Sequence, residues 1–280
     1  MPGGAVESER FEVTGNGGAT LQALASIPAA PKAVVALTHG YAEHTGRYRH
    51  VIDALNQSDY TVFAVDHRGH GACTGRRATI RRFDEFVDDF HLLVERARSR
   101  FSTIPRFVLA HSMGGLIAIR YALRHQHELA GLVLSGPALI VGESVPTWQT
   151  RLLLYLSRLA PDLPLLPATP GLLSRDPEVE RRMLADPLCY HGRIRLGLAR
   201  ELYLAAEETR NHLAAITLPF LVMHGAVDRV TSPRGSELLY DQAKSTDKTI
   251  KLWPDDRHEI FNELDADAVI ATMRDWMDPE

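Results

Sequence analysis

Short apolar runs alternate with segments of helix length along most of this chain, and this alternation constrains the fold more than any other feature. The apolar runs lie at residues 34–37, 61–65, 107–109, 131–134 and 220–223. The segments of helix length lie at 48–57, 84–100, 114–125, 232–243 and 265–276. Short runs bounded by turn residues suit strands that are buried on both faces of a parallel sheet. The pattern therefore predicts an α/β fold with right-handed crossover connections.

Three further strands complete the expected sheet. Residues 10–14 and 20–26 predict an antiparallel hairpin at one edge, and residues 250–253 predict the last strand. The chain has 280 residues, of which 45% are hydrophobic and 24% charged, as is ordinary for a globular protein with a sizeable core. This length suits one large domain, or a domain with an inserted subdomain.

The alternation breaks once, between about residue 137 and residue 213, where no clear strand is expected. This stretch is too long for a plain loop in a compact domain. We interpret it as a helical cap inserted at 137–213 above the carboxyl ends of the strands, between two parts of a core at 1–136 and 214–280. Apolar residues recur in it at helical spacing: Trp148, Leu152, Leu153, Tyr155, Leu156 and Leu159. Either they form the core of the cap, or some of them remain exposed.

The charge balance and the N-terminal residues exclude several classes of protein. The net charge of −4 gives no basic surface for nucleic acid. The two cysteines, Cys73 and Cys189, form no disulfide framework. The first residues do not resemble a signal peptide, and no apolar run is long enough to span a bilayer. We therefore expect a cytoplasmic protein with no nucleic-acid partner.

Residues 107–115 contain a candidate nucleophile. An apolar run ends at His111, Ser112 follows, and Gly114 lies where a helix is expected to begin. This arrangement resembles the Gly-x-Ser-x-Gly turn that exposes a serine hydroxyl at the carboxyl end of a sheet, with Ala110 in place of the first glycine. We interpret Ser112 as the nucleophile of a hydrolase, although so short a motif also occurs by chance.

A serine nucleophile needs an acid and a base, which follow it along the chain in that order in this kind of fold. Asp228 follows an expected strand, and His258 is the only histidine after Asp228. Both lie where a strand is expected to end, which is where parallel sheets build their sites. Order and position therefore predict Ser112, Asp228 and His258 as the catalytic residues. Asp255 and Asp256 are rival acids, but they lie too near His258 in one loop to be favoured.

Ester chemistry also needs hydrogen-bond donors for the oxyanion that develops on the substrate. One expected donor is the backbone N–H of Met113, which directly follows Ser112 at the start of a helix. The second is expected from the loop after the run 34–37, where Gly40 lets the backbone approach closely. The N–H of Tyr41 is the candidate in that loop.

Four segments carry a resemblance to a known family. They read HGYAEHTGRY at 39–48, DHRGHG at 66–71, AHSMGG at 110–115, and SRDPEV at 174–179 followed by DPL at 186–188 and HG at 191–192. With the loops of Asp228 and His258, they resemble the monoacylglycerol lipases, a lysophospholipase-like group of the α/β-hydrolase family. The resemblance covers nearly the whole chain and implies an α/β-hydrolase core with an inserted cap.

The resemblance also implies a small polar pocket for a glycerol head group, lined by Glu43, Arg47 and His111. These residue types supply the donors and acceptors that a short diol needs. Besides Ala110, two positions depart from the family pattern. Cys73 stands where the family has a serine, and Met183 lies where several relatives carry a tyrosine that helps to bind glycerol.

The function implied is hydrolysis of monoacylglycerols to fatty acid and glycerol through an acyl-enzyme on Ser112, with no metal or organic cofactor. Exposed apolar residues of the cap would then form an acyl-chain tunnel, or a patch that transiently contacts a lipid surface. A lysophospholipase and a broad carboxylesterase are alternatives within the same chemistry. A binding protein of this fold that has lost catalysis is the non-enzymatic alternative.

Overall fold

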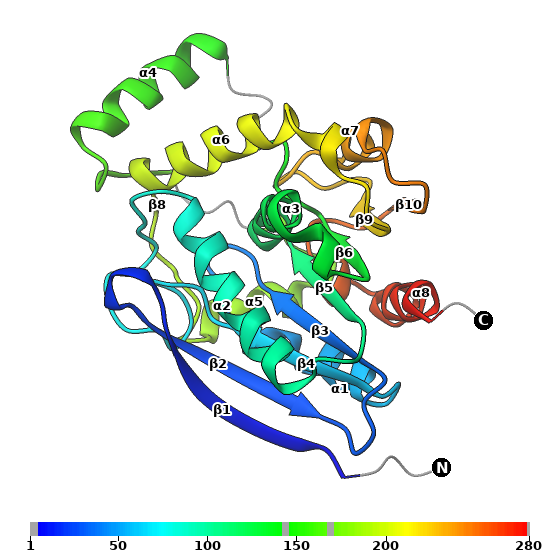
Figure 1. Cartoon of the computed structure of the whole chain (residues 1–280). Coiled ribbons are helices and arrows are strands. Elements are labelled where there is room, and N and C mark those ends of the chain that lie inside the picture. Colours follow the sequence, from blue (N-terminus) through cyan, green and yellow to red (C-terminus); the bar gives the residue numbers. More distant parts are fainter. Residues whose placement is uncertain (1–4, 142–145, 167–170, 279–280) are drawn as a thin grey trace.

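Eight strands form one central sheet in the order β1-β2-β4-β3-β5-β6-β9-β10 (Figure 1). The computed structural model describes residues 5–141, 146–166 and 171–278. The strands are β1 (Glu7–Thr14), β2 (Thr20–Ile27), β3 (Ala33–Thr38), β4 (Tyr60–Val65), β5 (Arg106–His111), β6 (Gly131–Ser135), β9 (Phe220–Gly225) and β10 (Lys248–Trp253). Strand β2 runs antiparallel to β1 and β4, and the other neighbours pair in parallel. The predicted α/β class and the antiparallel edge hairpin are both confirmed.

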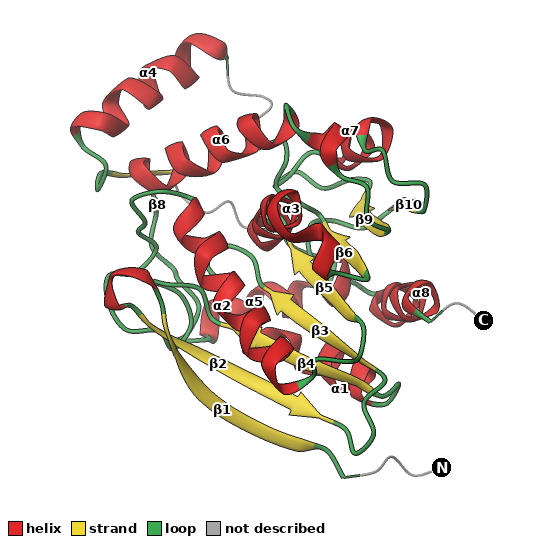
Figure 2. Ribbon diagram, in the orientation of Figure 1, coloured by secondary structure: helices red, strands yellow, loops and turns green. Residues whose placement is uncertain are grey.

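Helices cover both faces of the sheet, as Figure 2 shows. The helices α2 (Asp84–Arg100) and α3 (Met113–His125) share one core cluster, while α1 (Arg49–Asn56) and α8 (Ala266–Met277) share the other. Helix α7 (Pro233–Gln242) lies between β9 and β10 in the chain.

Strand β3 shows why the expected strands read as unbroken apolar runs. Val34 and Ala36 belong to the first core cluster, whereas Val35 and Leu37 belong to the second. Successive side chains of a strand point to opposite faces, so a strand covered by helices on both sides needs apolar residues at every position.

In its described residues, the segment between β6 and β9 holds three α-helices and two short strands. They are α4 (Thr147–Leu159), β7 (Pro164–Leu166), α5 (Pro177–Ala185), β8 (Ile194–Arg195) and α6 (Leu196–Arg210). The expectation of no strand in this segment was wrong, because β7 and β8 pair antiparallel. With three and two residues, these strands are too short to produce an alternating pattern. Residues 142–145 and 167–170 of the predicted cap lie outside the described residues.

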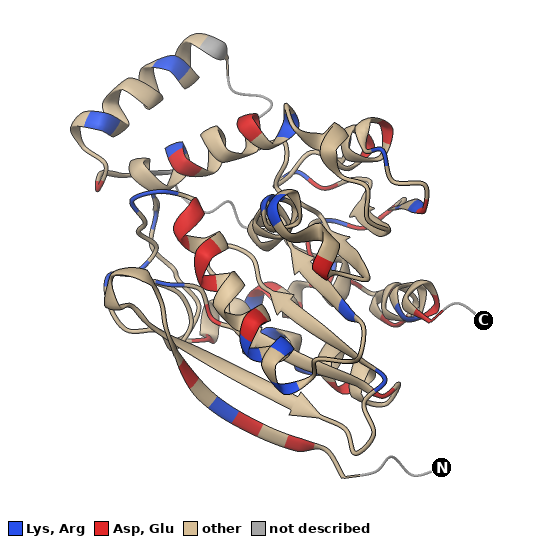
Figure 3. Ribbon diagram, viewed as in Figure 1, with Lys and Arg blue, Asp and Glu red and all other residues tan. Residues whose placement is uncertain are grey.

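Short 3₁₀ helices lie at Asn16–Gly18, Thr45–Tyr48, Gln126–Glu128, Leu213–Ala215 and Ile260–Asn262. Among the described residues, no helix is both long and apolar enough to cross a membrane. Acidic and basic residues are interspersed over the ribbon in Figure 3.

Candidate active site

Ser112 occupies the sharp turn between a strand and a helix. Strand β5 ends at His111 and α3 begins at Met113, and Ser112 between them has φ 55° and ψ −118°. A positive φ strains any residue with a side chain, so the surrounding structure must hold it in place. The Ser112 N–H donates to the Ser135 carbonyl at 2.9 Å, and its own carbonyl accepts from the Ala138 N–H at 3.0 Å. These bonds fix the turn from the neighbouring strand β6 and the loop that follows it.

The small residues around this turn have a packing reason. A Cβ atom at Gly114 would lie 2.3 Å from the carbonyl oxygen of Thr38, so α3 could not approach β3 if it carried a side chain there. Ala110 is buried within the core cluster, where its methyl group is accommodated in place of the usual elbow glycine. The turn therefore needs glycine on the helix side and tolerates alanine on the strand side.

The three predicted catalytic residues meet in one hydrogen-bonded row. The Ser112 hydroxyl lies 2.8 Å from Nε2 of His258, and Nδ1 of His258 lies 2.7 Å from Oδ2 of Asp228. Asp228 follows β9 and His258 follows β10, so both side chains come from carboxyl ends of parallel strands. All three residues are buried.

The two rival acids lie elsewhere. Asp255 is exposed, and Oδ1 of Asp256 accepts a hydrogen bond from Arg175 at 2.6 Å. Arg175 also contacts Glu263 and Asp265, so Asp256 belongs to an ion-pair cluster that ties the segment before α5 to the loop of His258.

The electrostatics of the row suit proton transfer. Burial alone would lower the pKa of His258, but the charge of Asp228 and the hydrogen bond to it raise that pKa above 6.5. Burial would likewise raise the pKa of Asp228, but the neighbouring imidazoles and their hydrogen bonds hold it well below its ordinary value. A carboxylate that stays charged can stabilise an imidazolium, which a general base becomes after it takes a proton.

The two candidate oxyanion donors flank Ser112. Met113 is the first residue of α3, so its N–H has no acceptor within the helix. Tyr41 lies in the loop after β3, and a Cβ atom at the preceding Gly40 would lie 3.1 Å from Cβ of Ser112. This contact shows how closely the loop passes the nucleophile. Neither N–H donates to an acceptor in the part of the chain that the structure describes.

Glu43 and Arg47 lie together behind this loop. Glu43 accepts hydrogen bonds from the Gly40 N–H at 2.5 Å and from the Tyr48 hydroxyl at 2.7 Å. Arg47 donates to Glu43 at 2.9 Å and to both oxygens of Glu259 at 2.7 Å. Burial raises the pKa of Glu43, whereas the bidentate Arg47 outweighs burial at Glu259 and lowers its pKa.

Sequence reasoning missed Glu259, although its place directly after His258 was a usable signal. It also placed His111 among the candidate binding residues, and the structure brings that ring to 4.7 Å from the ring of His258. Nδ1 of His111 lies 3.1 Å from the Ser135 carbonyl, and burial lowers its pKa to about 3. His111 is therefore a neutral side chain beside the base.

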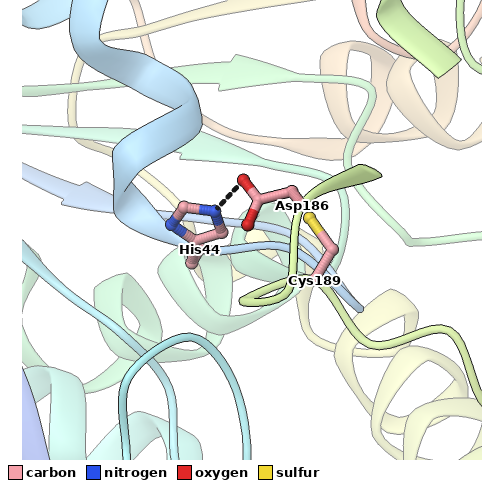
Figure 4. A group of neighbouring side chains, drawn as sticks. All are labelled: His44, Asp186 and Cys189. Atoms are coloured by element: carbon pink, nitrogen blue, oxygen red, sulfur yellow. Dashed lines mark hydrogen bonds and ion pairs between the residues drawn. The ribbon is translucent and has the colours of Figure 1, made fainter. Parts of the chain in front are cut away.

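A second cluster joins His44, Asp186 and Cys189 (Figure 4). These residue types can ligate a metal, but the hydrogen bonds of His44 do not suit one. Its Nδ1 accepts from the Gly46 N–H at 3.1 Å, so Nε2 carries the proton and donates to Asp186 at 2.9 Å. A metal on Nε2 would require the proton on Nδ1, which the Gly46 N–H blocks. Burial raises the pKa of the Cys189 thiol to about 12, which also opposes metal binding.

The same contacts make a latch between two parts of the chain. Besides the His44 to Asp186 bond, the Tyr190 N–H donates to the Ala42 carbonyl at 2.8 Å. Ala42 and His44 belong to the loop that carries Tyr41, while residues 186–190 follow α5. We call these two contacts the loop latch, since they attach the candidate oxyanion loop to the inserted segment.

Comparison with known proteins gives a consistent set of relatives. The sequence pattern of the family described as "Serine aminopeptidase, S33" matches residues 29–265. A monoacylglycerol lipase of Mycolicibacterium smegmatis is 41% identical over 247 residues, which is 88% of each chain. Human monoglyceride lipase is 34% identical over 235 residues, covering 84% of this chain and 78% of the human protein.

Solved structures agree with the fold. A monoacylglycerol lipase from Paleococcus ferrophilus matches with a TM-score of 0.80 and 29% identity, covering 98% of both chains. A soluble variant of the monoglyceride lipase of Saccharomyces cerevisiae, in complex with a substrate analogue, has a TM-score of 0.84 at 23% identity, over 99% of this chain and 96% of its own. At that identity the yeast structure supports the fold alone.

Proposed function

The chain belongs to the serine aminopeptidase S33 family, and on that basis we propose that it is a serine hydrolase that cleaves monoacylglycerols to fatty acid and glycerol. The hydrogen-bonded row of Ser112, His258 and Asp228 carries the hydrolase part of the proposal. The family is named for a peptidase, but the relatives at 41% and 34% identity are monoacylglycerol and monoglyceride lipases. Their activity supports the choice of an ester as the substrate.

In the proposed reaction, His258 takes the proton of Ser112 as its oxygen attacks the ester carbonyl. Asp228 holds the imidazole in place and stabilises its charged form. The N–H groups of Tyr41 and Met113 donate to the oxyanion, and losing one such donor typically lowers the rate by ~10²- to 10³-fold. His258 then gives its proton to the departing glycerol.

Water completes the cycle by the same route. His258 takes a proton from the water as it attacks the acyl group on Ser112. It then gives that proton to the Ser112 oxygen as the bond to the acyl group breaks and the fatty acid leaves. The steps use only side chains and backbone N–H groups of this chain.

We propose that Glu43, Arg47 and His111 form the polar end of the substrate site, where glycerol binds and leaves. A Cβ atom at Gly40 would lie 2.8 Å from Glu43 and 3.2 Å from His111, so both side chains converge on the loop beside Ser112. Glu43 already accepts from the loop backbone and from Tyr48, which supports a second role for it in holding the loop.

We further propose that residues 137–213 form a cap whose helix α4 contacts a lipid surface. Five apolar residues of α4 are exposed, among them Trp148 at 65% and Leu159 at 70%. The only charged residues of this helix are basic, Arg151 and Arg158, and both are exposed. An exposed apolar face flanked by arginines suits the interface of a membrane that contains anionic lipids.

A substrate panel on the purified protein tests the proposed function. It compares long-chain monoacylglycerols with lysophospholipids and with short p-nitrophenyl esters, using Ser112→Ala as the blank for each. We expect the highest kcat/KM for a monoacylglycerol. A higher value for lysophospholipids or for short esters would replace the proposed substrate with that class. Absence of both turnover and labelling by a fluorophosphonate probe would favour a binding protein instead.

A further inference from the structure

The Asp228 carboxylate accepts hydrogen bonds from several groups besides His258, and the proposed reaction needs only the one from His258. Oδ1 accepts from the backbone N–H groups of Val230 at 2.7 Å and Thr231 at 3.1 Å. Oδ2 accepts from His258 at 2.7 Å, and it also contacts the Thr231 hydroxyl at 2.9 Å and Nε2 of His224 at 3.0 Å. Two imidazoles therefore share one carboxylate oxygen, and only one of them touches the nucleophile.

His224 is built into the fold on its other side as well. It lies in β9 four residues before Asp228 and is completely buried. Its Nδ1 lies 2.7 Å from the hydroxyl of Ser236 in α7. A charged carboxylate only accepts hydrogen bonds, so Nε2 of His224 carries a proton that it donates to Oδ2 of Asp228. The ring therefore bridges α7 and the Asp228 carboxylate.

We propose that His224 is a positioning residue that fixes the orientation of Asp228 and limits how strongly this carboxylate draws a proton onto His258. The proposal rests on the proposed function only in taking His258 as the base. A donor on Oδ2 disperses the negative charge of the carboxylate, so less of it stabilises the imidazolium of His258. His224 thereby keeps the base from becoming too basic to act near neutral pH.

Other charged and titratable groups also face His258, and they bear on its proton affinity. His111 approaches from the end of β5, and Glu43 and Glu259 act from the loops after β3 and β10. Arg47 lies between those two carboxylates. None of these four residues has a hydrogen bond to His224 in the structure. A change at His224 therefore reaches His258 through Asp228 and through the Thr231 hydroxyl, which lies 3.3 Å from Nε2 of His224 and 3.2 Å from Nδ1 of His258.

The test compares three variants of the full chain by the pH dependence of kcat/KM with a soluble p-nitrophenyl butyrate substrate. His224→Leu removes the donor, His224→Gln keeps an N–H at the place of Nε2, and Ser236→Ala removes only the outer contact. On the acidic side of the pH profile, which we call the acid limb, kcat/KM falls with an apparent pKa. We expect this pKa to be higher by about half a pH unit or more in the Leu variant. We also expect kcat to fall by about 10- to 100-fold through the loss of orientation.

The Gln variant and Ser236→Ala should keep an acid limb close to that of the unchanged protein. A purely structural role for His224 would lower activity in the Leu variant without moving this limb. An unchanged or lowered acid-limb pKa in that variant, or equal shifts in the Gln and Leu variants, would overturn the proposal.

A second measurement does not depend on turnover. It tests the proposal even if the Leu variant does not fold or the protein does not cleave the ester. Nitrogen-15 NMR of histidine side chains in the intact protein reports the proton positions and the titration of His258 directly. We expect a protonated Nε2 on His224 at neutral pH, whereas a proton on Nδ1 alone would overturn the proposal. A protein that cleaves p-nitrophenyl butyrate but no monoacylglycerol would refute the proposed substrate and leave the role of His224 testable.

Discussion

Ser112 combines a reactive hydroxyl with a backbone conformation that disfavours any side chain. Its φ of 55° is held by hydrogen bonds to Ser135 and Ala138 and by the close packing of Gly114 on β3. The turn places the hydroxyl within 2.8 Å of His258. Catalytic geometry and backbone strain therefore reside in the same residue.

Replacing Ser112 with alanine should lower turnover of a monoacylglycerol by about 10⁴-fold or more, because the nucleophile is lost while the oxyanion donors remain. Release of fatty acid, followed by titration in a preparation free of host esterases, measures this change. Activity retained by the alanine variant would refute the assignment of Ser112.

Replacing the same residue with glycine separates strain from chemistry. Glycine adopts a positive φ without steric cost, although it loses more backbone entropy on folding. We expect the free energy of unfolding to be about 1 kcal/mol higher for Ser112→Gly than for Ser112→Ala. Urea denaturation of the two inactive variants measures the difference. A glycine variant that is no more stable than the alanine variant would show that the turn is not strained.

The pKa of His258 sets the expected pH dependence. This pKa is raised in the folded protein, and the protonated imidazole cannot accept the proton of Ser112. Activity is therefore complete above the raised pKa and is lost as the pH falls through it. We expect half-maximal kcat/KM at a pH above 6.5. A profile that stays flat down to pH 4 would exclude His258 as the base.

At the scale of elements, the sequence predicted the core helices closely. The expected segments differ from α1, α2, α3, α7 and α8 by no more than one residue at either end. Helix α2 has acidic residues in its first turn, Asp84 and Glu85, and basic residues in its last turn, Arg98 and Arg100. These charges complement the helix dipole, so the sequence indicated where this helix begins and ends. The short strands β7 and β8 have no comparable signal.

Helix α4 was identified by its apolar spacing, but the exposure of that face was not predictable. Exposure depends on which neighbours pack on a helix, and only the folded chain determines them. Trp148, Tyr155 and Leu159 are all more than half exposed. The apolar face of α4 is thus available for contact outside the protein.

Replacing Trp148 and Leu159 together with serine should weaken binding to vesicles of phosphatidylcholine and phosphatidylglycerol by at least about tenfold. Co-sedimentation measures the bound fraction, and turnover of p-nitrophenyl butyrate should not change. Leu264→Ser is the matched control, since Leu264 is 68% exposed and lies outside the inserted segment. Equal losses in the control and in the double variant would contradict the proposed contact by α4.

At the scale of the whole molecule, order along the chain was enough to identify the candidate row of Ser112, Asp228 and His258, because parallel strands bring their carboxyl ends to one edge. It was not enough for contacts that join distant loops. His44 and Asp186 are 142 positions apart in the sequence, and neither residue alone signals a partner. His224 was likewise indistinguishable from the other histidines until the position of its ring was known.

The loop latch links the inserted segment to the candidate oxyanion loop, so loosening it should slow catalysis. Asp186→Ala removes the partner of His44, and we expect kcat to fall by about 3- to 10-fold, less than for the loss of a whole oxyanion donor. Hydrogen exchange at residues 42–48 should become faster. Asp275→Ala, at an exposed position on α8, is the control and should change neither quantity. An unchanged kcat in the Asp186 variant would show that the latch serves stability alone.

The separation of Ser112 and His258 along the sequence has a consequence for synthesis of the protein on the ribosome. Ser112 and His258 are 146 residues apart, and the base follows β10. At about 5–20 residues per second, a ribosome needs about 7 to 30 s to add the base after the nucleophile. During that time the nascent chain carries an unactivated serine. Ser112 therefore gains its base only after β10 has been made.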